Sequence, residues 1–211
     1  LKKFIKLKKK KYFEFLLLIT LGALTSLSLP PYNFFLINYL LSKNKVDEAK
    51  KIIRISRKKY NSNLLLEQTE LFFLDKKYKK ITNFFNCKNP NDSLAEFFYV
   101  IANLYASERD YRSSNFYLKI SLFLNDKFLP NKALLAENLY FQNKSKASKD
   151  IYRSLKSIGS VYDWHASKNI ASIILDEKGK KYSLKSLEKD FNLLKKPKLK
   201  HYYELANFYK D

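Results

Sequence analysis

The chain of 211 residues has few of the residues that interrupt regular structure, with only three glycines and five prolines. Turns between β-strands use both residues repeatedly, so their scarcity argues against an all-β fold. Long stretches without either residue favour helices. The sequence therefore predicts an all-α protein.

Cysteine, histidine and methionine are also scarce. Cys87 is the single cysteine, which excludes an internal disulfide and a metal site built from thiolates. We expect it to be a small, buried or half-buried apolar residue. The chain has no methionine and begins with Leu1. This indicates either a non-standard start codon or an excerpt of a longer protein.

Residues that could carry catalysis do not converge in the sequence. There is no glycine-rich phosphate loop, no Ser-His-Asp arrangement and no paired metal-ligand spacing. The acidic pairs Asp47-Glu48 and Asp176-Glu177 are expected at turns and helix starts, where the helix dipole favours carboxylates. His165, beside Trp164 near a helix start, fits a half-exposed structural role better than ligation. We expect no catalytic residue, no metal site, no cofactor and hence no enzyme.

The net charge of +21 comes from 41 Lys and Arg against 20 Asp and Glu. Residues 1–29 contribute +6, and the rest is spread over residues 30–211 without a dense basic block. Nucleic-acid modules cluster their charge and use Arg, whereas nearly all the basic residues here are Lys. A chain rich in Lys, Asn, Ile, Phe and Tyr is also what an AT-rich genome encodes. A nucleic-acid partner is not expected, although a basic surface that attracts nucleic acid or anionic lipid stays an alternative.

The N-terminal segment, residues 1–29, joins a basic stretch to an apolar run from Phe15 to Leu24 and then to small polar residues. This layout is typical of a secretory signal or membrane anchor, with the lysines on the cytoplasmic side. It predicts a periplasmic or membrane-anchored protein, with membrane association through residues 1–29. The alternative is an ordinary first helix with a basic face in a cytoplasmic protein.

An internal repeat carries the prediction of fold. Ala102, Ala136, Ala171 and Ala206 each follow a large aliphatic residue and precede a large apolar residue three places on. Their spacings are 34, 35 and 35 residues. Two antiparallel helices approach closely only where one of them lacks a bulky side chain, so these alanines predict helix crossings. A single pair cannot bury its apolar face alone, so several pairs must stack.

Each alanine-containing stretch is followed by a polar turn and a second amphipathic stretch. The predicted turns are residues 107–110, 142–146 and 176–181, the last with Gly179 as a helix stop. The second stretches, residues 111–124, 147–155 and 182–194, repeat apolar residues at the helical period. Ser114 and Ser148 are the small residues expected at the crossing on the second helices.

The pattern is weaker before residue 93 but continues. Residues 33–41 and a helix that starts near Val46, with Ala49 at its crossing, form one expected pair. Residues 63–74 and 77–85 form the next, and residues 86–92 are expected to be a connecting loop. The expected units are residues 32–61, 62–92, 93–128, 129–160, 161–196 and an incomplete unit, 197–211.

With these motifs, residues 32–211 resemble the tetratricopeptide repeat family. The chain departs from the family because Ala replaces its favoured Gly, Trp occurs only as Trp164, and the terminal Pro is irregular. These departures leave open a related class such as a half-tetratrico array. The resemblance implies a right-handed superhelical array of antiparallel helix pairs, an α-solenoid. It also implies a protein or peptide partner on the concave face, as in bacterial scaffolds of envelope assembly.

The first helix of each pair lines the concave face in arrays of this type. The resulting candidate peptide-binding residues are Tyr99, Asn103, Glu137, Tyr140, Lys168, Ser172, Tyr203 and Asn207. The alternatives are an ordinary solvated surface and a structural or oligomerising segment of a larger protein. Because the chain stops after one helix of its last unit, Leu205, Phe208 and Tyr209 are expected to lack a partner helix. We expect the protein to continue, or this helix to pair elsewhere.

Overall fold

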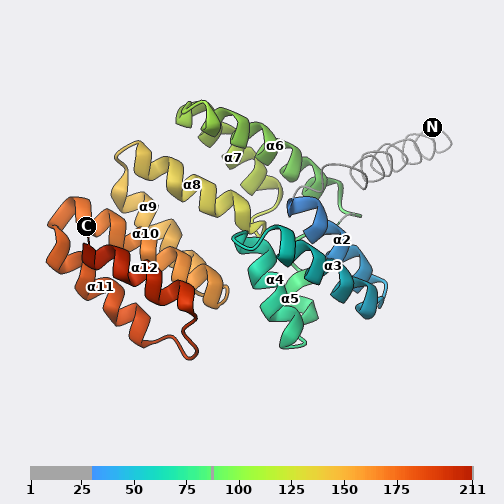
Figure 1. The fold of residues 1–211 in the computed structure, drawn as a ribbon. Coiled ribbons are helices and arrows are strands. Elements are labelled where there is room, and N and C mark those ends of the chain that lie inside the picture. Colours follow the sequence, from blue (N-terminus) through green and yellow to red (C-terminus); the bar gives the residue numbers. More distant parts are fainter. Residues whose placement is uncertain (1–29, 87, 211) are drawn as a thin grey trace. The chain divides into compact units, whose positions relative to one another are not determined.

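The computed structural model describes residues 30–86 and 88–210, which form eleven α-helices and no β-strand (Figure 1). The all-α prediction is therefore confirmed for this part of the chain. The expectations for residues 1–29 and for Cys87 fall outside the described residues. The chain divides into two compact units, one up to Glu70 and one from Leu71, so that the division falls within α4 (Leu64–Leu74). Each unit is described by itself.

Unit 1 is built on a helix pair, α2 (Pro30–Ser42) and α3 (Val46–Lys59), followed by the first residues of α4. Phe34, Ile37 and Ile53 form apolar surface that is almost fully buried. Ala49, the small residue predicted at this crossing, is fully buried. The helix period thus places the large residues of α2 and α3 around one small side chain.

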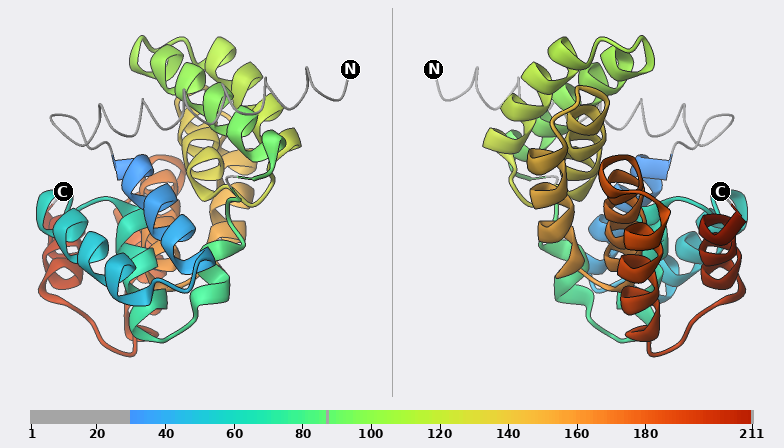
Figure 2. Two further views of the ribbon diagram at one scale, coloured as in Figure 1. Left: turned by 90° about the vertical axis from the view of Figure 1, so that its right-hand side faces the viewer. Right: turned by 90° about the vertical axis from the view of Figure 1, so that its left-hand side faces the viewer.

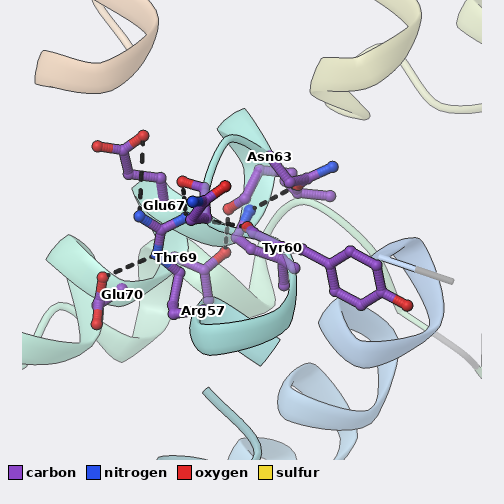
Figure 3. Close-up of polar contacts among 9 residues, drawn as sticks. Arg57, Tyr60, Asn63, Glu67, Thr69 and Glu70 are labelled. Carbon is purple, nitrogen blue, oxygen red and sulfur yellow. Dashed lines mark hydrogen bonds and ion pairs between the residues drawn. The ribbon is translucent and has the colours of Figure 1, made fainter. Parts of the chain in front are cut away.

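Arg57 joins the end of α3 to α4 in unit 1, as Figure 3 shows. Its Nε donates to the Glu70 carboxylate at 3.0 Å, and its Nη2 lies 4.0 Å from the Glu67 carboxylate. Its Nη1 donates to the carbonyls of Tyr60 and Asn61 at 3.2 and 2.7 Å. The planar guanidinium can reach four acceptors at once, which an ammonium on a lysine stem cannot do. Arg57 therefore stabilises the loop between α3 and α4.

Unit 2 begins with the end of α4 and continues as a series of helices that lie side by side (Figures 1 and 2). The helices are α5 (Tyr78–Thr82), α6 (Pro90–Ser107), α7 (Tyr111–Leu124), α8 (Leu129–Phe141), α9 (Ser145–Lys156), α10 (Ser160–Lys178), α11 (Lys180–Asn192) and α12 (Leu199–Lys210). They pack mainly as the neighbouring pairs α6/α7, α8/α9 and α10/α11. Each pair also contacts the helix that follows it.

The predicted alanine crossings are present in all three complete pairs of α6 to α11. Ala102, Ala136 and Ala171 are on helices and have no exposed surface. The Ser148 hydroxyl donates to the Ala136 carbonyl at 2.7 Å, and the Ser183 hydroxyl, twelve residues after Ala171, makes the equivalent bond at 2.7 Å. A serine at the crossing is small enough for the two helices to approach closely, and its buried hydroxyl still has a hydrogen-bond acceptor.

Four of the turns within pairs share one backbone geometry at the end of the first helix. Five turn residues have positive φ: Asn44, Lys76, Arg109, Asn143 and Gly179, with φ of 59°, 56°, 61°, 60° and 83°. In the first four, this residue donates its N–H to a carbonyl three residues back, and the next residue donates to one five residues back. Those bonds define a Schellman motif. The motif recurs at spacings of 32, 33 and 34 residues, close to the spacing of the alanines. Gly179 follows 36 residues later without it and donates its N–H to the Leu175 carbonyl instead.

Buried amides join α7 to α8. Asn138 Nδ2 donates to Ser114 Oγ at 2.7 Å and to Asn115 Oδ1 at 3.0 Å, and Asn131 Nδ2 donates to Ser121 Oγ at 2.7 Å. Both asparagines of α8 are almost fully buried. Because a buried amide without a partner is costly, these bonds favour one register between the two helices.

Three details of the sequence prediction were wrong. Helix α5 stops at Thr82, three residues before residue 85, and the Phe84 carbonyl beyond it accepts a bond from Asn125 Nδ2 at 3.0 Å. Residues 90–92 are not loop, because Asn89 caps α6 and Pro90 occupies its first turn. Asp176-Glu177 lies near the end of α10, not at a helix start or turn.

None of the described helices combines the length and the apolar composition needed to cross a membrane.

Candidate binding surface

Side-chain contacts connect the first helices of successive pairs in unit 2. We call α6, α8, α10 and α12 the first-helix row. Tyr140 on α8 donates its hydroxyl to the Asp176 carboxylate on α10. Trp164 Nε1 and Lys168 Nζ on α10 both donate to the Glu204 carboxylate on α12, the first at 2.6 Å. These contacts hold adjacent first helices next to each other, so their free surfaces adjoin.

Three of the predicted binding residues gather where α6 and α8 meet. Burial raises the pKa of the half-buried Tyr99, the neighbouring Asn103 amide lowers it, and the Glu137 carboxylate raises it further. Glu137 therefore lies close enough to Tyr99 for their charges to interact, although the two residues are on different helices. Asn103 and Glu137 are both exposed. The structure thus brings together a tyrosine, an amide and a carboxylate that are all accessible from solvent.

The Glu137 side chain is exposed, but the protein around it removes part of the hydration of its carboxyl group. This desolvation raises the pKa of its carboxyl. The same carboxylate contributes to the raised pKa of Tyr152 on α9, whose main cause is burial. A hydrogen-bond donor that docks here would be attracted to a carboxylate whose hydration is already incomplete.

Tyr140 extends this cluster toward α10. It is half-buried, and its hydrogen bond to Asp176 raises the pKa of its hydroxyl, with burial as a second cause. Tyr140 follows Glu137 by one helical turn on α8, and the charges of both interact with Tyr152 of α9. We call Tyr99, Asn103, Glu137 and Tyr140 the α6–α8 cluster.

The predicted residues of α10 have other partners in the structure. Lys168 is half-buried and forms an ion pair with Glu204, so its ammonium already has a carboxylate partner. The Ser172 hydroxyl donates to the Lys168 carbonyl at 3.2 Å, one turn back in the same helix. The polar groups of Lys168 and Ser172 are therefore less available to a ligand than those of Asn103 and Glu137.

On α12, Tyr203 and Asn207 are exposed, as expected for surface residues. The expectation that Leu205 and Phe208 lack a partner was wrong. Both pack against the buried cluster of Trp164, Ala171 and Leu187, because the inward face of α12 lies on α10 and α11. Tyr209 is 52% exposed, although its hydroxyl reaches the Glu188 carboxylate of α11.

Each histidine lies against an aromatic ring, His165 against Tyr152. Burial, together with the charges of Lys168 and Lys200, lowers the pKa of His165 to about 4, so its imidazole is neutral at physiological pH. The His201 ring lies 5.3 Å from the Trp164 ring. Within residues 30–86 and 88–210, no three His, Cys, Asp or Glu side chains gather as a metal site would require.

Sequence reasoning did not identify Tyr152, Asp176 or Glu204 as part of this surface. Tyr152 interacts electrostatically with Glu137 and Tyr140, Asp176 accepts a hydrogen bond from Tyr140, and Glu204 forms an ion pair with Lys168. Glu204 lies 36 residues after Lys168, close to the alanine period, so aligning opposite charges one period apart would have found that pair.

Comparisons of the chain with protein-family models, with curated proteins and with solved structures found no match. The assignment of a role to this surface therefore depends on its own residues.

Proposed function

We propose that this protein is a tetratricopeptide-type scaffold that binds a protein or peptide segment along its first-helix row, with the α6–α8 cluster as the main contact. In this proposal the helix pairs continue as a right-handed superhelical array, so that the first-helix row becomes its concave side. No catalytic residue, metal or cofactor is assigned.

The recurrence of one pair geometry supports the array. The alanine crossings, the serine-to-carbonyl bonds and the Schellman turns all repeat at nearly the same period. Units of equal construction that stack in one direction build a regular solenoid.

The α6–α8 cluster is the observation that carries the binding role. A peptide backbone needs both hydrogen-bond donors and acceptors, and Asn103, Glu137 and the tyrosines supply both within reach of one another. Tyrosine and asparagine also offer large contact area and adaptable hydrogen bonding at low entropic cost. The desolvated carboxylate of Glu137 favours a ligand that brings an amide or ammonium donor.

The test uses short random peptides displayed on phage and selected against the immobilised full chain. Selected peptides are then synthesised, and their Kd values are measured by titration calorimetry. We expect the double variant Asn103→Ala/Glu137→Gln to weaken binding by about tenfold or more, equivalent to about 1.4 kcal/mol. Both side chains are exposed, so the variant should fold normally.

The matched control is Asp150→Asn, which neutralises an exposed carboxylate on the second helix α9. It should leave peptide affinity unchanged. The site at the α6–α8 cluster would be contradicted by an equal loss of peptide affinity in the double variant and the control. Selected peptides that bind the double variant as tightly as the unchanged chain would also contradict it. Binding that collapses with added salt would instead favour the basic-surface alternative.

We also propose that residues 1–29 direct the chain to the periplasm or anchor it to a bacterial membrane. Their basic start and following apolar run support this. Fusing residues 1–29 to a reporter that is active only after export should give activity. The same fusion with Leu17 and Leu18 changed to Asp should not, and activity in both fusions would contradict the proposal.

A further inference from the structure

Helix α12 has a second apolar face that points to solvent. Leu199, Tyr202, Ala206 and Tyr209 are spaced by three, four and three residues, so they lie along one side of the helix. We call them the α12 stripe. Leu199 is 85% exposed, Tyr202 53% and Tyr209 52%, and Ala206 is exposed as well. Leu205 and Phe208 lie on a neighbouring side of the helix and pack against α10 and α11, so the apolar surface of α12 extends beyond the face that it buries.

Two of the four stripe positions, those of Leu199 and Ala206, are buried in both preceding first helices. Leu199 falls 35 residues after Trp164 and 70 after Leu129, which are 3% and 1% exposed. Ala206 falls at the same intervals after Ala171 and Ala136, and both of these are fully buried. In α8 and α10 the alanine is covered by the second helix of its own pair, whose serine donates to the alanine carbonyl. The α12 stripe is therefore the equivalent of a helix-covered face.

The helices that cover this face elsewhere in the chain share a short pattern. Each has a small residue followed, four positions later, by a large apolar one, and both are at most 4% exposed. The pairs are Ala49 and Ile53, Ser114 and Leu118, Ser148 and Tyr152, and Ser183 and Leu187. The pattern specifies what a helix must offer to fit an alanine crossing of this protein.

The charge beside the stripe restricts the partner further. Lys181, Lys185 and Lys189 are spaced four residues apart, so they share an exposed face of α11. On the same helix, Glu188 and Phe191 contact Tyr209 and Tyr202 of α12. A helix lying on the α12 stripe would have this row of ammonium groups on its flank. Acidic residues on that flank would be stabilised, and basic ones repelled.

From these observations we propose that the α12 stripe docks an amphipathic helix of a partner protein, antiparallel to α12. The partner helix presents Ser or Ala at the Ala206 crossing, Leu or Tyr four residues later, and Glu or Asp toward α11. Where the small residue is Ser, its hydroxyl donates to the Ala206 carbonyl. The docking face differs from the α6–α8 cluster, so it adds a second binding surface to the proposed scaffold.

The probe is a stapled, fluorescein-labelled peptide with the sequence of α9, Ser145–Lys156, carrying Ala147→Glu and Ser154→Glu. Both positions are exposed and lie on the same side of α9 as Ile151, which packs toward the preceding second helix, α7. Its binding to the full chain is measured by fluorescence anisotropy. We expect saturable binding that weakens about tenfold or more in the protein variant Ala206→Leu. A peptide that also carries Ser148→Leu should lose binding to the same extent, because its crossing residue is then bulky.

The control protein variant is Ser154→Leu, an equally exposed small-to-large change on α9. It should bind the peptide as the unchanged chain does, and circular dichroism should show that both variants fold. The Asn103→Ala/Glu137→Gln variant should also bind normally, so failure at one surface is distinguishable from failure at the other. An acidic peptide that does not bind, or that binds regardless of both crossing changes, would overturn the proposal. So would self-association of the chain that Ala206→Leu abolishes, because the occupant would then be a second copy.

Discussion

A single side chain, Arg57, holds the loop between α3 and α4 in place. Its guanidinium serves two carboxylates and two backbone carbonyls, and its side chain is only 17% exposed (Figure 3). Removing a partly buried partner of this kind leaves acceptors that have lost their solvent as well as their donor.

Arg57→Met should therefore destabilise unit 1 by about 2–4 kcal/mol. Amide hydrogen exchange over α3 and α4 would report this locally, with urea unfolding as a second measurement. The control is Arg153→Met, since Arg153 pairs with Asp150 on the open surface and should matter little. Similar exchange rates in the two variants would contradict the role given to Arg57.

Glu96 on α6 makes the stability of the folded protein depend on pH. Burial raises the pKa of its carboxyl to about 7. Below about pH 4.5 the carboxyl is protonated in both the folded and the unfolded chain, so it does not lower the free energy of unfolding. As the pH rises toward 7, the unfolded chain ionises first, and the native state loses stability.

Glu96→Gln should thus stabilise the protein by about 1–3 kcal/mol at pH 8 and have little effect at pH 4. Urea unfolding at the two pH values measures this difference. Glu108→Gln, an exposed change just after the same helix, should show no such dependence on pH. A gain for Glu96→Gln that is equal at both pH values would show that ionisation is not the cause.

At the scale of the helix, the turn geometry is determined by hydrogen bonds and not by glycine. Lys76 and Arg109 have positive φ, a conformation that costs a residue with a Cβ about 1–2 kcal/mol. The Schellman bonds that end the helices offset this cost.

Arg109→Gly should consequently stabilise the protein by about 0.5–1 kcal/mol, after allowance for the greater freedom of glycine in the unfolded chain. Thermal unfolding gives the measurement. Lys119→Gly, in the middle of α7, should instead cost about 1 kcal/mol. Destabilisation by both changes would mean that the Arg109 side chain contributes more than its strain.

The alanine crossings allow one substitution to be compared in two environments. Ala136→Leu inserts bulk where two helices touch and should cost about 1–3 kcal/mol. Ala206→Leu has the same register but faces solvent, so its effect should stay within about 0.5 kcal/mol. Equal costs in denaturant unfolding would show that the two positions are not equivalent.

The sequence predicted the helix pairs well because a small residue at a fixed period is a local signal. Ala102, Ala136 and Ala171 could be placed at crossings without coordinates, and the structure confirms them. The bond between Asn125 and the Phe84 carbonyl, which lies just beyond the early end of α5, could not be foreseen because the two residues are 41 positions apart. Nor could the pairing of Tyr140 with Asp176, since it depends on how adjacent pairs stack. Contacts within a repeat follow from its period, whereas contacts between repeats depend on side chains that vary.

At the scale of the whole molecule, the net charge of +21 makes a separate prediction. The chain should bind a mixed-sequence single-stranded oligonucleotide in dilute salt. It should lose about a hundredfold or more in affinity between about 50 and about 200 mM salt, because counterion release drives such binding. Fluorescence anisotropy would show the loss. Peptides at the α6–α8 cluster should be far less sensitive, and an equal loss for both ligands would argue against a distinct peptide site.

The serine-to-carbonyl bonds have a mechanical consequence. They fasten the two helices of a pair at the crossing, where Ser148 meets Ala136 and Ser183 meets Ala171, and a tight turn fastens the same helices at one end. The pair α8/α9 is joined to the pair α10/α11 differently, by longer side chains, with Lys149 bonded to Glu177 and Lys156 to Asp190. Each of these two pairs should therefore move as a stiff unit. When a ligand or a pulling force bends unit 2, we expect strain to accumulate at this border more than at the border between α7 and α8, which buried asparagines hold in register.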